Sequence, residues 1–134
     1  MASIDALTDD GCRFVSDRHL ATLSTMRRDG GIHVVAVGFT LDAGVVRIIT
    51  SDRTQKVRNV ERDTRATVAQ VSGAQWLSIA GQATIERDAD AVAHAEELYA
   101  RRYRPPRANP RRVVIRLVPD RVMASAGLLH RAGR

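Results

Sequence analysis

Hydroxyl and cationic side chains gather in residues 48–59, where a strand-like pattern gives way to a helix-like one. The N-terminus of a helix presents unpaired N–H groups and a partial positive charge, so it binds phosphate well, and nearby cations strengthen such a site. Lys56 lies in this segment and is the single lysine among 21 Lys and Arg residues. The segment predicts a site for an anionic ligand, with a simple helix cap beside solvated cations as the alternative.

A second cluster, residues 101–112, holds the densest positive charge in a chain whose formal net charge is +6. Arginine forks bind phosphates and carboxylates, so this cluster predicts contacts with nucleic-acid phosphates or with an acidic small molecule. Aromatic residues make up only 4% of the chain, too few for the stacking platforms of single-strand binders. We therefore expect no nucleic-acid partner, and a solvated helix end is the alternative for this cluster.

The sequence offers no pattern of side chains that would catalyse a reaction unaided, so it leaves the catalytic residues unknown. The four histidines are far apart and lack metal-ligand spacing, which predicts no metal site. Dinucleotide-binding, Walker and nucleophile-elbow motifs are missing from the sequence. The single cysteine, Cys12, falls on an amphipathic segment and is expected to fill the core. An enzyme of this sequence would need a bound cofactor to carry its reaction.

The sequence also predicts where the protein works. No apolar run approaches the roughly 20 residues that span a bilayer, and the first residues lack the basic and apolar segments of a secretory signal. One cysteine cannot form an internal disulfide. We expect a soluble protein of the reducing cytoplasm with no membrane partner.

The elements that position these clusters are expected to be short strands joined by tight turns. Strand formers and alternating patterns predict strands over residues 19–26, 32–41, 45–50, 65–71, 75–86, 111–118 and 121–125. Helices are expected over residues 9–17 with Thr8 as N-cap, from Ser51 as N-cap to residue 62, and from Asp88 to the prolines at 105–106. Gly81 is expected to mark a bulge or bend.

This order of elements predicts a mainly β fold with short helices, built as a small antiparallel barrel. It is expected to form one domain over residues 1–134, with loose ends at residues 1–7 and 127–134. Residues 32–41 are apolar at almost every position, so both faces of that strand need cover that the few helices cannot provide. A homodimer is the expected solution.

Four segments resemble the pyridoxamine-phosphate-oxidase-like split-barrel flavin and deazaflavin oxidoreductases: residues 18–25, 33–39, 56–59 and 75–81. Residues 99–115 are similar to the coenzyme F420-dependent biliverdin reductases of mycobacteria and other actinobacteria, a group within that family. The resemblance covers residues 7–129. It implies a homodimer of six-stranded antiparallel split β-barrels, with two cofactor sites in grooves across the subunit interface.

The resemblance also implies which residues bind the cofactor, position by position. Those implied to hold its phosphate and ribityl chain are Thr50, Ser51, Gln55, Lys56 and Asn59. The backbone implied to lie along the deazaflavin ring is that of Val35, Ala36, Val37 and Gly38. The missing side chain of Gly38 would permit close approach of that ring.

Two further sets of residues are implied less directly. Trp76, Leu77 and Ser78 match positions that the partner subunit supplies. Arg104, Arg107, Arg111 and Arg112 are implied to lie near the acidic tail of the cofactor or near the propionates of the substrate.

The implied reaction is hydride transfer from reduced coenzyme F420, an 8-hydroxy-5-deazaflavin, to the central methine carbon of biliverdin, which yields bilirubin. The protein would orient the two molecules and exclude water, with a proton from solvent or from a group that the sequence does not identify. An FMN-binding relative would show more basic residues in the strand 33–39, where this chain has only His33. The alternatives are an FMN-dependent split-barrel oxidoreductase and a non-catalytic deazaflavin- or tetrapyrrole-binding protein.

Overall fold

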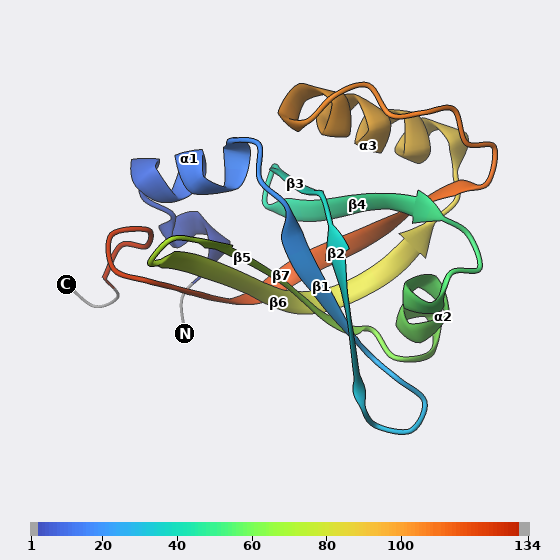
Figure 1. Cartoon of the computed structure of the whole chain (residues 1–134), viewed down its shortest axis with the longest axis horizontal. Coiled ribbons are helices and arrows are strands. Elements are labelled where there is room, and N and C mark those ends of the chain that lie inside the picture. Colours follow the sequence, from blue (N-terminus) through green and yellow to red (C-terminus); the bar gives the residue numbers. More distant parts are fainter. Residues whose placement is uncertain (1–2, 132–134) are drawn as a thin grey trace.

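The computed structural model describes residues 3–131 and is mainly β with short helices, as predicted (Figure 1). Its helices are the 3-10 helix η1 (Ile4–Ala6) and the α-helices α1 (Asp9–Ser16), α2 (Gln55–Arg62) and α3 (Ala89–Arg102). Its strands are β1 (Ala21–Met26), β2 (Ile32–Val37), β3 (Phe39–Asp42), β4 (Val45–Ser51), β5 (Arg65–Ser72), β6 (Gln75–Glu86) and β7 (Arg112–Ala124). None of the helices in residues 3–131 has both the length and the apolar character needed to cross a membrane.

All seven strands belong to one antiparallel sheet in the order β2-β1-β5-β6-β7-β4-β3. The sheet curls around a single core, with α3 beside β3 and β4, and α2 near the far ends of β4 and β6 (Figure 1). The two edge strands, β2 and β3, follow one another in the chain with only Gly38 between them. The chain therefore passes from one edge of the sheet to the other within one residue.

The strand boundaries differ from expectation at two places. The expected strand over residues 32–41 is two strands, because β2 pairs with β1 whereas β3 pairs with β4, and Gly38 separates them. The two strands expected over residues 111–118 and 121–125 are one strand, β7. Pro119 does not break it because Pro119 lies opposite Gly81 at a register shift, where a residue without an N–H is tolerated. The sheet thus has seven strands and not the six that the resemblance implies, and the bulge at Gly81 is confirmed.

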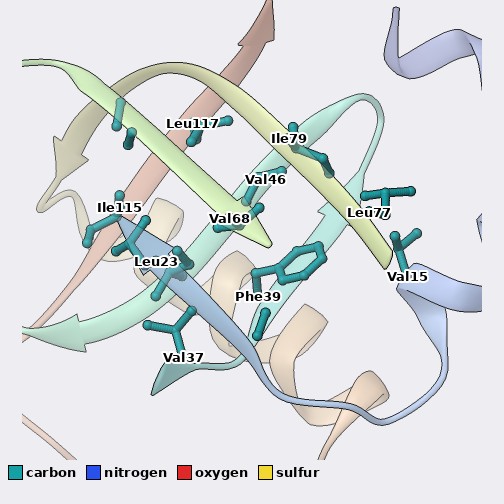
Figure 2. Close-up of a cluster of buried hydrophobic side chains, with 14 of the residues drawn as sticks. Val15, Leu23, Val37, Phe39, Val46, Val68, Leu77, Ile79, Ile115 and Leu117 are labelled. Atoms are coloured by element: carbon teal, nitrogen blue, oxygen red, sulfur yellow. The ribbon is translucent and has the colours of Figure 1, made fainter. Parts of the chain in front are cut away.

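The core follows from the alternation of side chains along these strands. Leu23 of β1, Val68 of β5, Ile79 of β6 and Ile115 of β7 are each at most 1% exposed and face the inside of the curl (Figure 2). Their neighbours along β1, β5 and β6 are more exposed, whereas in β7 Val113 and Val114 are buried as well. Fully burying a side chain of this size stabilises a fold by about 1.5–3 kcal/mol, so the sheet is the main source of stability.

The start of α2 and the position of Cys12 differ from expectation. Thr8 and Asp88 cap α1 and α3 as predicted, but α2 begins after Thr54 because Ser51 is still paired with Arg112 in the ladder between β4 and β7. Cys12 is exposed and does not fill the core, because α1 turns its Val15 side inward.

The chain ends are not loose where the structure describes them. Leu128 is 1% exposed and packs in the core, and Leu7 pairs with Leu129. Burial of the Leu128 side chain holds this part of the C-terminal segment in place. The rest of the expected loose ends, residues 1–2 and 132–134, lies outside the described residues.

A buried arginine fastens α3 to the sheet. The Arg102 guanidinium donates hydrogen bonds to the carbonyl oxygens of Asp17 (3.0 Å) and Phe39 (2.7 Å) and to the side-chain oxygen of Gln70 (2.7 Å). It also lies 4.7 Å above the centre of the Phe39 ring. Burial lowers the pKa of the Arg102 side chain, but every nitrogen of its fork has an oxygen partner. This contact sets the position of the end of α3 and of the loop that follows it.

Candidate functional site

A cavity of about 500 Å³ lies between β2, β4, α2 and the end of α3. Its walls come from six separate parts of the sequence. The residues that line it are Ala36, Val37, Gly38, Ile49, Thr50, Lys56, Tyr99, Arg104, Pro105, Pro106, Arg107 and Arg112. The two basic clusters singled out in the sequence therefore meet at one place in the fold.

The cavity is strongly cationic. Four of its lining residues carry positive charge, and none of the twelve is an aspartate or glutamate. Arg112 is paired with Glu96 at 2.6 Å, but the side chains of Lys56, Arg104 and Arg107 make no ion pair or hydrogen bond with any residue from 3 to 131. Three unpaired cations around one hollow form a site that favours an anionic ligand.

Lys56 is the most enclosed of these three cations. Its side chain is partly buried on the first turn of α2, and this burial lowers the pKa of the ammonium group. The cost of removing a charge from water is offset when a charged partner binds to it. A phosphate placed in the cavity would supply such a partner, and the Thr50 hydroxyl lies in the same wall.

The other walls of the cavity are apolar. Ala36, Val37 and Ile49 come from β2 and β4, and the two prolines at 105 and 106 come from the loop after α3. A ligand that joins a flat apolar ring to an anionic group would match this arrangement of side chains.

A buried amide holds α2, and with it Lys56, against the sheet. Asn59 is fully buried, and its side-chain NH₂ donates to the hydroxyl of Thr25 on β1 at 3.1 Å. Its side-chain oxygen accepts a hydrogen bond of 2.8 Å from Gln55. Asn59 therefore lies on the buried face of α2, where it has a structural role, and does not line the cavity.

Replacing Asn59 by alanine is expected to destabilise the fold by about 1–2 kcal/mol, because the Thr25 hydroxyl loses its partner in a buried place. Urea unfolding followed by circular dichroism measures this change. The matched control is Arg58→Ala, which removes an exposed side chain from the same helix and is expected to change the free energy of unfolding by less than about 0.5 kcal/mol. Equal stability of the Asn59→Ala variant and the unaltered protein would contradict this structural role.

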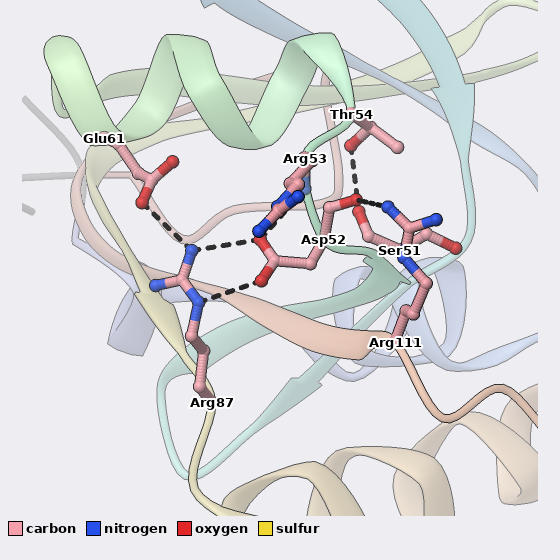
Figure 3. A network of polar contacts seen from close by, with 7 residues as sticks. All are labelled: Ser51, Asp52, Arg53, Thr54, Glu61, Arg87 and Arg111. Carbon is pink, nitrogen blue, oxygen red and sulfur yellow. Dashed lines mark hydrogen bonds and ion pairs between the residues drawn. The ribbon is translucent and has the colours of Figure 1, made fainter.

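A polar network fixes the loop between β4 and α2 (Figure 3). Arg87 donates to both carboxylate oxygens of Asp52, at 3.0 and 3.1 Å, and to Glu61 at 3.0 Å. Hydrogen bonding from the Arg87 side chain holds the pKa of the Asp52 carboxyl below its usual range. Arg53 has a backbone φ of 64°, in the left-handed region, and its N–H donates to the Asp52 side chain at 2.9 Å. These contacts hold the start of α2 beside the end of β4, where Thr50 and Lys56 face the cavity.

The structure brings together eight of the sixteen site residues proposed from the sequence. Those that line the cavity are Ala36, Val37, Gly38, Thr50, Lys56, Arg104, Arg107 and Arg112. The residues of β2 and those of the loop after α3 are more than 60 positions apart in the sequence, so only the fold makes them neighbours.

Five of the other eight have different surroundings. The Ser51 hydroxyl accepts a hydrogen bond from Asn109 at 2.8 Å, and Arg111 reaches the carbonyl oxygen of Asp52 at 3.5 Å. Val35 packs against the core, and Asn59 lies buried beneath α2. Gln55 lines a separate hollow of about 430 Å³ with residues of the turn between β1 and β2.

The three residues on β6 are remote from this cavity within the one chain. Leu77 is buried in the core at 1% exposure, whereas Trp76 is 39% exposed and Ser78 lies on the outer face of the sheet. None of the three lines the cavity.

Four lining residues were missed by the sequence reasoning: Ile49, Tyr99, Pro105 and Pro106. The helical spacing of Tyr99 suggested a packing role, and the prolines suggested only the end of a helix. Their position within the arginine-rich segment was the available signal. The rings of Tyr99 and Tyr103 lie 4.7 Å apart, and a side chain at Gly38 would approach the Tyr103 ring to 3.0 Å. The space beside Gly38 is thus filled by aromatic rings of this chain.

Comparison with known proteins gives one family and several similar structures. Residues 7–125 match the pyridoxamine 5′-phosphate oxidase family. An "F420H(2)-dependent biliverdin reductase" from Mycobacterium tuberculosis (strain CDC 1551 / Oshkosh) is 52% identical over 128 residues, which are 94% of this chain and 93% of the relative.

Two solved structures share the fold at lower identity. One described as "F420 Reductase" superposes with a TM-score of 0.70 and 24% identity over 82% of this chain and 93% of its own. A conserved hypothetical protein from Mycobacterium tuberculosis superposes with a TM-score of 0.78 and 22% identity, covering 98% of this chain and 96% of its own.

Proposed function

Because the chain belongs to the pyridoxamine 5′-phosphate oxidase family, we propose that it is a coenzyme F420-dependent oxidoreductase that reduces biliverdin to bilirubin. The observation that carries this proposal is the cavity in which the unpaired cations Lys56, Arg104 and Arg107 face the apolar residues of β2. Coenzyme F420 joins a flat deazaflavin ring to a phosphate and an acidic tail, the combination that these walls suit. The 52% identical relative supports the same cofactor and substrate.

The residues of the cavity have distinct roles in this proposal. Lys56 and the Thr50 hydroxyl hold the phosphate, and the backbone of Ala36, Val37 and Gly38 lies along the ring. Arg107 binds the acidic tail, with Arg112, which is paired with Glu96, beside it. When bound in its reduced form, the cofactor supplies a hydride for the central methine carbon of the substrate, and a proton from solvent completes the reduction to bilirubin. The apolar walls orient the ring and keep water from it, which is how a protein assists a reaction that its cofactor carries out.

A fluorescence titration tests the cofactor, with oxidised coenzyme F420 and FMN run in parallel. Tight binding of the deazaflavin alone, followed by biliverdin turnover with the reduced form, is the expected result. Preference for FMN would place the protein in the flavin branch. Binding of the deazaflavin without turnover of biliverdin would instead indicate a carrier.

We also propose that the working unit is a homodimer. Two rows of outward-facing side chains cross four adjacent strands of the sheet. The first row is Val34, Ser24, Thr67 and Ala80, and the second is Ala36, Thr22, Ala69 and Ser78. All eight are uncharged, and none is fully buried. A wide, uncharged face of small and β-branched side chains that stay at least partly exposed in residues 3–131 is typical of a subunit interface.

This interface would explain the residues on β6 that the cavity of one chain leaves out. Ser78 belongs to the second row, and Trp76 lies two residues away on the same strand with 39% of its surface exposed. Ala36 of that row also lines the cavity. A partner subunit seated on this face would therefore bring its own Trp76 close to the open side of the cavity.

Mixing two inactive variants tests the shared site. Trp76→Ala and Lys56→Ala are each expected to bind the cofactor poorly, because each dimer has two damaged sites. Random exchange of subunits should restore about a quarter of the sites, since half of the dimers are mixed and each mixed dimer has one intact site. Titration with oxidised coenzyme F420 measures this fraction. No recovery, with exchange confirmed by mass spectrometry of differently tagged subunits, would rule out the shared site.

A further inference from the structure

A second cavity of about 350 Å³ adjoins the first. It is lined by Arg18, His19, Leu20, Tyr99, Tyr103 and Arg104. Tyr99 and Arg104 line both cavities, so the two hollows share a wall. The proposed cofactor roles use the first cavity and leave the second without one.

Two aromatic rings form a fixed wall of the second cavity. The Tyr99 and Tyr103 ring centres are 4.7 Å apart, and the ring planes are inclined by 36°. The Tyr103 hydroxyl lies 2.8 Å from the carbonyl oxygen of Phe39 and 3.3 Å from that of His19, to which it can donate. Leu20, which is 62% exposed, extends the apolar surface. A flat conjugated molecule could pack against this wall.

Two arginines give the second cavity its charge. Arg18 and Arg104 form no ion pair or hydrogen bond within residues 3–131, and no aspartate or glutamate lines the cavity. The Nδ1 atom of His19 lies 2.7 Å from the carbonyl oxygen of Leu20, which holds the imidazole ring in place. The cavity therefore combines an aromatic wall with two cations that are available to carboxylates.

We propose that this second cavity is the substrate subsite, which takes an extended conjugated molecule bearing carboxylate groups. Arg18 and Arg104 bind the carboxylates, and the Tyr99 and Tyr103 rings pack against the conjugated system. Lys56, Arg107 and Arg112 are then left to the cofactor in the first cavity. Because Tyr99 and Arg104 line both cavities, an extended molecule held in the second cavity can reach past them to the cofactor ring in the first. This inference rests on the proposed function, because it assigns the substrate side of the same reaction.

Arg18 is the residue to change, because it lines the second cavity and not the first. The probe is biliverdin, whose binding to the protein loaded with oxidised coenzyme F420 is followed by absorbance. Arg18→Ala is expected to weaken biliverdin binding about tenfold or more and to raise the KM for biliverdin, with the affinity for coenzyme F420 changed by less than about twofold. Arg18→Lys should restore part of the loss, because it keeps the charge without the planar fork.

Arg13→Ala is the matched control. Arg13 lies on α1 with its side chain 65% exposed and lines neither cavity. Its replacement by alanine removes the same charge as Arg18→Ala. It should leave biliverdin binding unchanged. The dimethyl ester of biliverdin, which lacks both carboxylates, should bind weakly and equally to the unaltered protein and to Arg18→Ala.

The outcomes separate this inference from the function on which it rests. Arg18-dependent binding of biliverdin without turnover would support the subsite and overturn the proposed reaction. Turnover with biliverdin affinity independent of Arg18 would overturn the subsite and leave the reaction standing. A loss of coenzyme F420 affinity in Arg18→Ala as large as the loss of biliverdin affinity would also overturn the subsite.

Discussion

Replacing Lys56 by alanine is expected to weaken the binding of oxidised coenzyme F420 by about 1.5–3 kcal/mol, or roughly 10- to 150-fold. The variant loses the partly buried ammonium group, whose side chain has no partner in residues 3–131, and with it the charge-assisted hydrogen bond that we propose it makes to the phosphate. The loss should be large for a single cation because the partial burial of Lys56 removes competing water from the contact. A fluorescence titration under fixed salt measures it, since screening by salt would reduce the difference.

Two further variants make the Lys56 result specific. Arg58→Ala removes one positive charge from the same helix, but Arg58 is exposed and lines no part of the cavity, so its affinity should stay within about twofold of the unaltered protein. Lys56→Arg is expected to recover only part of the affinity, because a planar guanidinium does not fit a site shaped for an ammonium. Unchanged affinity in a folded, dimeric Lys56→Ala variant would show that the phosphate lies elsewhere.

Replacing Gly81 by alanine is expected to destabilise the fold by roughly 3 kcal/mol or more. A Cβ atom at this position would lie 2.0 Å from the carbonyl oxygen of Val118 and 2.9 Å from the Cα atom of Pro119, both of them backbone atoms. Neither can move without disturbing the register shift through which β6 and β7 stay paired. Thermal unfolding should show a fall in Tm on the order of 10 °C.

Gly31→Ala is the matched control for Gly81→Ala. A Cβ atom at Gly31 would meet only side-chain atoms of Asp29 and Arg27, at 3.0 Å and beyond, and those can rotate away. Its effect on the free energy of unfolding should stay within about 0.5 kcal/mol. If the two variants unfold at the same temperature, the close approach of the two strands at Gly81 is not a constraint on the fold.

The sequence predicts most elements of the fold because local signals decide them. Thr8 and Asp88 stand where a side-chain oxygen can accept from the first turn of a helix, and both do so. Alternating apolar residues predict β5 and β6 closely. The errors occur where pairing overrides local preference. Ser51 has the right chemistry for a cap, but its ladder partner Arg112 keeps it in β4.

The change of sheet edge at Gly38 illustrates the same limit. Residues 32–41 are uniformly apolar, and no periodicity distinguishes one strand from two. Which neighbours β2 and β3 choose depends on residues far away in the chain, on β1 and β4. A single sequence does not contain that information in a local pattern.

Half of the site residues proposed from the sequence line the cavity, and the type of residue explains which half. Unusual residue types stand out in a sequence, and Lys56 and the arginines at 104, 107 and 112 all line the cavity. Tyr99 and Ile49 are ordinary residues of a helix and a strand, so only their place in the fold reveals that they line it too. Asn59 shows the opposite case, because a polar residue in a binding motif proved to be buried beneath the helix.

The edge strands β2 and β3 are joined by Gly38, but in residues 3–131 no ladder of backbone hydrogen bonds connects them. The cavity lies along this seam, with β2 on one side and β4, the neighbour of β3, on the other. Moving β2 away from β4 therefore breaks side-chain contacts but no strand pairing. Local opening at this place can thus cost a small fraction of the free energy of global unfolding. A ligand as large as a deazaflavin can then exchange with solvent while the paired strands, and the core inside them, stay intact.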